Sequence, residues 1–287
     1  MKMNWYARMM LVLAGFAALT LASCSDDDPE TPNIPDVKME VAGSYVPFIA
    51  DPKNDPVGAI GIEATWIDPE NIPTIDLTAL GLNKQPLNLA LNMVNQLAGV
   101  YYTGGLAQFD FNADGSVGAK YHKSIGTSFM KPVFSKETFT FPGTDPTGIA
   151  AAQAISYYTE GGKLFISVKK AFIAAIGKQE NMDLIAIIDG MLAKYPTLDI
   201  AATPETYAIP LKYTIGADKS LTLYIDKAMM MPYLPLLTEV VLPLLPENVD
   251  MDGGGVIPVR ALVTTVFTDL FTKTQSLVIS IKLQKIA

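Results

Sequence analysis

Three stretches of the chain alternate apolar and polar residues on both sides of a short turn signal. They are QFDFNADGSVGAKYH (108–122), ISYYTEGGKLFISVKK (155–170) and LKYTIGADKSLTLYIDK (211–227). Alternation with period two is typical of strands that bury one face, and Asn, Asp and Gly tolerate the positive φ of tight turns. Each stretch therefore predicts a β-hairpin. The same pattern predicts single strands, which are expected at 43–49, 59–66 and 276–286.

Other segments repeat apolar residues at the spacing of a helix. They predict a helix over 88–99 that stops at Gly99, and a short helix that ends at Ile176. A third helix is expected from Asn181, as its N-cap, to Tyr195, and a fourth over 258–273 with Pro258 in its first turn. Hairpins interspersed with helices indicate an α+β fold. We expect a mainly antiparallel, curved β-sheet built from hairpins and packed against several helices.

Two of the hairpins resemble each other beyond their alternation. LFISVKKA (164–171) aligns with LTLYIDKA (221–228), and an apolar segment follows both. This similarity predicts an internal hairpin–helix duplication over 154–176 and 210–234. Chance similarity between two amphipathic strands is the alternative.

The first 23 residues have the pattern of an export signal. Lys2 and Arg8 precede an apolar run over 9–22, which is too short for an ordinary membrane-spanning helix. The run ends in LASC, which contains the only cysteine of the chain, Cys24. This motif resembles the lipobox of bacterial lipoproteins. The resemblance implies that residues 1–23 are removed and that Cys24 is acylated, which would anchor the protein to a membrane; a plain secretory signal with an incidental cysteine is the alternative.

Three aspartates, Asp26 to Asp28, follow the cysteine at once. They resemble the export signal that directs lipoproteins of the Bacteroidetes type to the cell-surface side of the outer membrane. Residues 24–38 are rich in acid and proline and cannot bury enough apolar surface to fold, so they are expected to form a tether. Residues 39–287 are then a single α+β body. This body resembles uncharacterised domains of surface lipoproteins, a resemblance that implies no particular activity.

Charge excludes one class of partner. The chain has a net charge of −8, and removal of residues 1–23 takes away Lys2 and Arg8 and no acid, which leaves −10. Binding to a phosphate backbone requires clustered Lys and Arg, so nucleic acid is excluded. The same removal leaves Trp66 as the last tryptophan, which limits the flat aromatic surface available for stacking on sugars.

Candidate catalytic residues are scarce. His122 is the only histidine, and it lies between lysines at the end of a predicted strand, which favours an exposed polar residue over a general base. The chain lacks the G-x-S-x-G, H-E-x-x-H, Walker and G-x-G-x-x-G motifs. Acylation of Cys24 would exclude thiol catalysis and cysteine-ligated metals. We therefore assign no catalytic residue, cofactor or metal and expect a protein that is not an enzyme, although a pair of glycosidase carboxylates stays open.

One acidic segment resembles half of a calcium loop. Asn248, Asp250, Asp252 and Gly253 match the first positions of such a loop, but Val259 occupies the twelfth position, where a bidentate Glu belongs. We interpret the segment as an acidic, Gly-rich connection, with calcium binding as the alternative.

The segment Ala228–Leu245 is almost entirely apolar. Its only charge is Glu239, and Pro232, Pro235 and Pro243 exclude one regular helix. Ordinary core is the favoured interpretation. The alternative is a pocket lining for an acyl or other apolar ligand, since methionine adapts to irregular surfaces.

Three functions are consistent with this sequence. The first is a surface-anchored binding protein that holds an apolar or amphipathic ligand between residues 229–245 and the inner sheet face, which predicts an enclosed apolar cavity. The second is a glycan-binding or glycan-processing accessory lipoprotein, which predicts an open cleft with exposed Tyr or Trp. The third is a structural or protein-interaction role with a broad exposed apolar patch.

Overall fold

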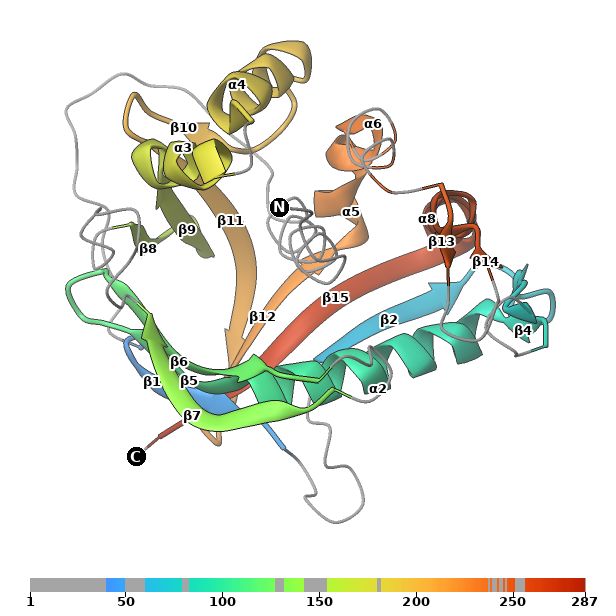
Figure 1. Cartoon of the computed structure of the whole chain (residues 1–287), viewed down its shortest axis with the longest axis horizontal. Coiled ribbons are helices and arrows are strands. Elements are labelled where there is room, and N and C mark those ends of the chain that lie inside the picture. The colour runs from blue at the N-terminus through green and yellow to red at the C-terminus, as the bar shows by residue number, and fades with distance from the viewer. Residues whose placement is uncertain are drawn as a thin grey trace.

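The structure is a computed structural model of the chain (Figure 1). It describes residues 40–49, 60–78, 83–126, 132–141, 154–179, 182–236, 247–250 and 256–286, together with residues 238, 242 and 245. The expected signal peptide, Cys24 and the tether to residue 38 lie outside the described residues, so nothing in the structure tests them.

Eleven strands of the described chain form one sheet. They are β1 (Gly43–Pro47), β2 (Ile60–Trp66), β5 (Leu106–Phe111), β6 (Val117–Ser124), β7 (Phe134–Phe141), β8 (Ile155–Glu160), β9 (Lys163–Lys169), β10 (Ala201–Ala202), β11 (Thr206–Ile215), β12 (Ser220–Asp226) and β15 (Thr274–Lys285). The order is β7-β6-β5-β1-β15-β12-β11-β9-β8, with β2 beside β15 and β10 beside β11. Each pairing between these strands is antiparallel.

Short elements and helices complete the described chain. The two small strand pairs are β3 (Thr74–Ile75) with β4 (Gln85–Pro86), and β13 (Val249–Asp250) with β14 (Val256–Ile257). The helices are α2 (Leu87–Gly105), α3 (Lys170–Gln179), α4 (Leu184–Lys194), α5 (Lys227–Met230), the 3₁₀-helix η3 (Met231–Tyr233), α6 (Leu234–Leu236) and α8 (Val259–Lys273). The architecture confirms an α+β fold with a mainly antiparallel, curved sheet.

The sheet curls until two distant parts of it meet. Figure 1 shows β5, β6 and β7 in green on one side of β1 and β15, and β9, β11 and β12 in yellow to orange on the other. At one end, Ser116 in the β5–β6 turn forms an isolated bridge with Ser156 of β8. The Tyr157 N–H donates to the Gly115 carbonyl at 2.7 Å, and the Tyr157 hydroxyl donates to the Asn112 carbonyl at 2.8 Å. These bonds close one end of the curl.

Strand register assigns the core to one face of the sheet, which we call the inner face. Pairs such as Leu221 with Leu283 and Tyr45 with Phe109 lie directly opposite each other, so their side chains share this face. At the closed end its side chains are at most 2 % exposed, and they come from six different strands. They are Tyr45, Phe111, Tyr157, Leu164, Leu221 and Leu283. Buried side chains of α2, α5 and α8 belong to the same core cluster.

Two of the predicted hairpins close through the same turn. Asp114 and Asp218 each accept the N–H and the hydroxyl of the serine two residues later, at 2.9 and 2.6 Å for Ser116 and at 3.0 and 2.6 Å for Ser220. The residue between them has positive φ, 81° at Gly115 and 61° at Lys219. The third hairpin closes through Gly161–Gly162, where both φ values are positive, as a two-residue turn requires.

The long helix α2 differs from its prediction. Gly99 does not end it, and the helix continues to Gly105. Gly99 is buried inside the helix, and its carbonyl accepts the Thr103 hydroxyl at 2.9 Å. A glycine inside a helix lowers its intrinsic stability by only about 1 kcal/mol, which packing against the sheet can offset.

Two further helix boundaries differ from those predicted. The helix predicted to end at Ile176 runs to Gln179. Helix α4 begins after Asp183, whose carboxylate accepts the Ala186 N–H at 3.1 Å, so Asp183 rather than Asn181 is its N-cap. Helix α8 follows its predicted span, with Pro258 as the residue before its first turn.

The two similar hairpins have closely corresponding boundaries. When Leu164 is aligned with Leu221, β9 and β12 begin and end at equivalent residues. A helix then starts at equivalent lysines, Lys170 and Lys227. The duplication itself stays a prediction, because amphipathic strands that run into helices can match by chance.

Candidate ligand-binding face

A row of aromatic side chains runs along the inner face from the closed end of the curl. We call Tyr45, Phe111, Phe109, Tyr121 and Phe139 the inner aromatic row. Ring centroids lie 5.9 Å apart for Tyr45 and Phe111, 4.9 Å for Phe111 and Phe109, and 5.8 Å for Tyr121 and Phe139. The first two residues are 1 % exposed, whereas the last three are half-buried. The row therefore leads from the closed core to a partly open surface.

The sequence places this row through simple alternation. Phe109 and Phe111 are two residues apart on β5, so they share a face. Phe109 lies opposite Ala119 of β6, and Tyr121, two residues further on, lies opposite Phe139 of β7. The row thus crosses the sheet towards β7, which ends the sheet order on that side.

A cation stands at the outer end of the row. Lys123 follows Tyr121 by two residues on β6, and its ammonium lies 3.7 Å from the centre of the Phe139 ring. The side chain is exposed. Among the described residues, no carboxylate lies within ion-pair distance of it. Its interaction with the ring is of the cation–π type and leaves the ammonium accessible to an anion.

Side chains that are mostly aliphatic continue the inner face on the other side of the closed end. Ile166 lies opposite Ile209, and Leu223 lies opposite both Tyr213 and Ile281. Apart from the buried Leu223, these residues are half-buried. The described inner face thus carries apolar side chains that stay partly exposed, and the curl closes where Ser116 meets Ser156. The enclosed cavity expected from the sequence stays a prediction.

The methionine-rich segment packs as core in its described part. Met229 and Met230 are 4 % and 2 % exposed and belong to the main core cluster. Tyr233 forms a smaller cluster with Leu198. Asp226 caps α5 by accepting the Met229 N–H at 3.0 Å. These side chains fill the interior, as the favoured interpretation of Ala228–Leu245 expects.

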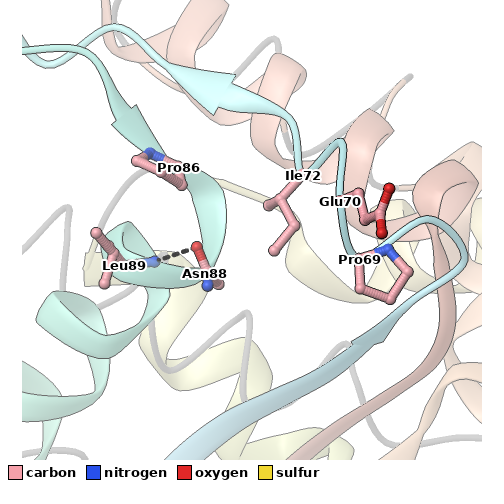
Figure 2. Close-up of a pocket in the computed structure, with 6 residues that line it drawn as sticks. All are labelled: Pro69, Glu70, Ile72, Pro86, Asn88 and Leu89. Carbon is pink, nitrogen blue, oxygen red and sulfur yellow. Dashed lines mark hydrogen bonds between the residues drawn. The ribbon is translucent and has the colours of Figure 1, made fainter.

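A second apolar feature lies at the start of α2, away from the aromatic row. A hollow of about 330 Å³ lies between the β2–β3 connection and the first turn of the helix. Figure 2 shows the residues that line it. Its lining residues are Pro69, Glu70, Ile72, Pro86, Asn88 and Leu89. The Leu87 N–H donates to the Pro73 carbonyl at 2.7 Å and so joins the two walls. Glu70 is the only charged residue of the lining.

The outer surface of α2 was not singled out from the sequence. Its 19 residues include none with a charge, and Leu89, Met93 and Val94 are between 38 % and 50 % exposed. The signal that could have found it is the missing charge, because most surface helices carry charged residues on their solvent face.

One network of titratable groups joins α3, α4 and β11. The Tyr207 hydroxyl donates to Asp189 at 2.7 Å, and the Lys170 ammonium lies 3.3 Å from the same carboxylate. The Tyr207 hydrogen bond and the nearby lysine lower the pKa of Asp189 below its ordinary value. Burial, and then the hydrogen bond to Asp189, raise the pKa of Tyr207. Each of these polar groups has a partner, which is the pattern of a structural tie between elements.

The residues weighed from the sequence are dispersed in the fold. His122 is half-buried on β6, with Nδ1 3.1 Å from the Glu137 carbonyl oxygen. Trp66 is only 8 % exposed and belongs to the core. Asn248 and Asp250 lie at the start of the β13–β14 pair, while Asp252 and Gly253 fall outside the described residues, so the calcium alternative is untested. Within the described ranges, no cluster of three His, Cys, Asp or Glu side chains could hold a metal ion.

Comparisons with known proteins give no relative. No protein-family model matches the chain, no curated protein is similar to it, and no solved structure matches its fold. In the part of the chain that the structure describes, no helix has both the length and the apolar character needed to cross a membrane.

Proposed function

We propose that this protein is a non-enzymatic binding protein that is held at the outer membrane by an acylated Cys24 and carries an apolar or amphipathic ligand on its inner face. The observation that carries the binding role is the half-buried state of Phe109, Tyr121 and Phe139, which continue a fully buried core onto accessible surface. Apolar side chains left partly in water gain free energy when a ligand covers them, about 25 cal/mol per Å².

The anchor rests on sequence alone. Cys24 is the only cysteine, it follows an apolar run, and residues 25–38 separate it from the expected start of the body at residue 39. Acyl chains contribute about 0.8 kcal/mol for each methylene buried in a bilayer, and stable attachment takes more than one chain. An extended tether over residues 24–38 would reach about 50 Å, which allows the body to stand clear of the membrane.

Labelling with radioactive palmitate tests the anchor. Cells that carry the full chain should incorporate the label into this protein, and the Cys24→Ala variant should neither incorporate it nor fractionate with membranes. A Cys24→Ala variant that still fractionates with membranes would overturn the anchor.

The ligand role has its own experiment. Cells that carry the full chain are exposed to dodecanol with a photoreactive group near the end of its chain, and labelled peptides are located by mass spectrometry. Adducts should concentrate on β5, β6 and β7. Adducts spread evenly over peptides of both sheet faces, or absent, would contradict the binding role.

The glycan alternative has less support. The last tryptophan, Trp66, is buried and offers no stacking surface. Binding to a glycan array together with absence of dodecanol labelling would reverse this preference.

A further inference from the structure

We propose that the ligand is a single-chain acyl carboxylate, with its head group bound by Lys123 and its chain lying along the inner aromatic row. This inference rests on the proposed binding role and adds to it the class of ligand and the residue that recognises the head group.

The row and its lysine form a gradient in polarity along one line of the sheet. Lys123 is an exposed cation, Tyr121 and Phe139 beside it are half-buried apolar rings, and Phe111 further in is fully buried. An amphiphile with an anionic head has the same order of chemistry from head to tail. A ligand of the opposite charge would place a cation beside the Lys123 ammonium, which like-charge repulsion disfavours.

Three other lysines of the sheet and of α3 already have carboxylate partners, and two of them, Lys163 and Lys212, lie opposite each other on the other face of the sheet. Lys170 pairs with Asp189, Lys212 is bonded to Asp226, and Lys163 pairs with Asp199 at 3.2 Å. Lys120 lies on the same strand as Lys123 but points to the opposite face, where it donates to the Gln108 side chain at 3.1 Å. In the described part of the chain, two lysines adjoin the aromatic row. Lys285 lies at its closed end, half-buried, with its ammonium 5.7 Å from the centre of the Tyr45 ring, and it donates to the Ala42 carbonyl. Lys123 lies at the outer end and is the exposed one of the two.

The net charge of the body makes a local cation necessary for such a ligand. With residues 1–23 removed the chain would carry −10, so an anion is repelled over most of the surface. Lys123 offsets this repulsion at short range. A partly exposed charge pair changes an equilibrium constant by about fivefold.

The test compares two ligands of equal chain length on cells that carry the full chain. One is photoreactive dodecanoic acid and the other is photoreactive dodecanol, which lacks the charge. Labelling of β5–β7 by the acid should fall about fivefold in Lys123→Met, while labelling by the alcohol should not change. Lys123→Arg should restore labelling by the acid.

Lys120→Met is the matched control, because it removes a lysine from the opposite face of the same strand, and it should label like the parent with both probes. Equal labelling of Lys123→Met and Lys120→Met by the acid would overturn the head-group assignment and leave the binding role intact. Failure of both acid and alcohol to label the parent protein would overturn the binding role and this inference with it. Unchanged alcohol labelling shows that Lys123→Met is folded.

Discussion

The side chain of Asn95 bonds both backbone groups of Ile62. Its Oδ1 accepts the Ile62 N–H at 2.7 Å, and its Nδ2 donates to the Ile62 carbonyl at 3.1 Å. Among the described strands, β2 pairs with β15 alone, so the backbone groups of Ile62 that bond Asn95 face the edge of the described sheet. An amide side chain offers one donor and one acceptor, as a neighbouring strand would. Helix α2 is thereby fixed against the edge of β2, which protects that edge from pairing with another chain.

Replacement of Asn95 should be costly. Asn95→Ala leaves two partly buried backbone groups without their partner, and we expect a loss of about 1–3 kcal/mol in the free energy of unfolding, measured by urea denaturation of the full chain. Asn92→Ala, an exposed position on the same helix, should change it by no more than about 0.5 kcal/mol. Equal effects of the two substitutions would show that the Asn95 bonds contribute nothing.

Lys219 adopts a backbone conformation that suits glycine. Its φ is 61°, and the residue at the corresponding place in the similar turn is Gly115. The left-handed conformation costs an L-residue roughly 1 kcal/mol, so Lys219→Gly should raise the stability of the protein by up to about that amount. Lys219→Ala keeps the same strain and should bring no gain. The melting temperatures of the two variants would distinguish relief of strain from loss of the lysine side chain.

Asp226 has two separable roles. Its carboxylate caps α5 and pairs with Lys212. Burial alone would raise the pKa of Asp226, but the bonds from Lys212 and from the Met229 N–H outweigh it and lower the pKa. Asparagine still caps a helix, so Asp226→Asn should lose only the ion pair and lower the free energy of unfolding by about 1 kcal/mol at neutral pH. Asp226→Ala also loses the cap, so it should lower the free energy of unfolding by roughly 1 kcal/mol more.

The pH dependence of Asp226→Asn follows from the sign of that shift. A carboxyl group whose pKa is lowered on folding stabilises the protein fully above its unfolded pKa of about 3.9, and the contribution is lost as the pH falls through the lower folded value. The difference in the free energy of unfolding between the parent protein and Asp226→Asn should therefore be constant from pH 7 to about pH 5 and should become smaller in more acid solution. A difference that persists at pH 2 would contradict the ionic origin of the effect.

The local sequence pattern predicts most of the strands, because alternation and turn formation depend on residues that are neighbours in sequence. The turns at Gly115, Gly161 and Lys219 follow from residue types that accept positive φ or cap a turn, so alternation and turn chemistry together gave three hairpins. The continuation of α2 beyond Gly99 could not be predicted, because it depends on packing against β2, which is distant in sequence.

The candidate site depends on contacts that no local pattern contains. Phe109 and Tyr121 alternate correctly for one face, but the sequence does not show that Phe139 lies opposite Tyr121, since β6 and β7 pair with an irregular register after His122. The curl depends on Ser116 meeting Ser156, a contact between separate hairpins. The described part of the segment from Ala228 packs as core, as the favoured interpretation expects, but apolar composition by itself does not distinguish a filled interior from a lined pocket.

The two apolar features can be separated by a pair of matched substitutions. Phe139 belongs to the aromatic row, and Leu89 belongs to the hollow beside α2. Removal of a large half-buried side chain from a ligand contact weakens the binding free energy by about 1–2 kcal/mol, which raises the dissociation constant roughly tenfold. Phe139→Ser should therefore reduce labelling of β5–β7 by photoreactive dodecanol about tenfold, and Leu89→Ser should leave it unchanged. The reverse result would assign the ligand to the hollow at the start of α2. An equal loss of labelling in both variants, together with lower protein levels, would indicate general destabilisation in place of a local contact.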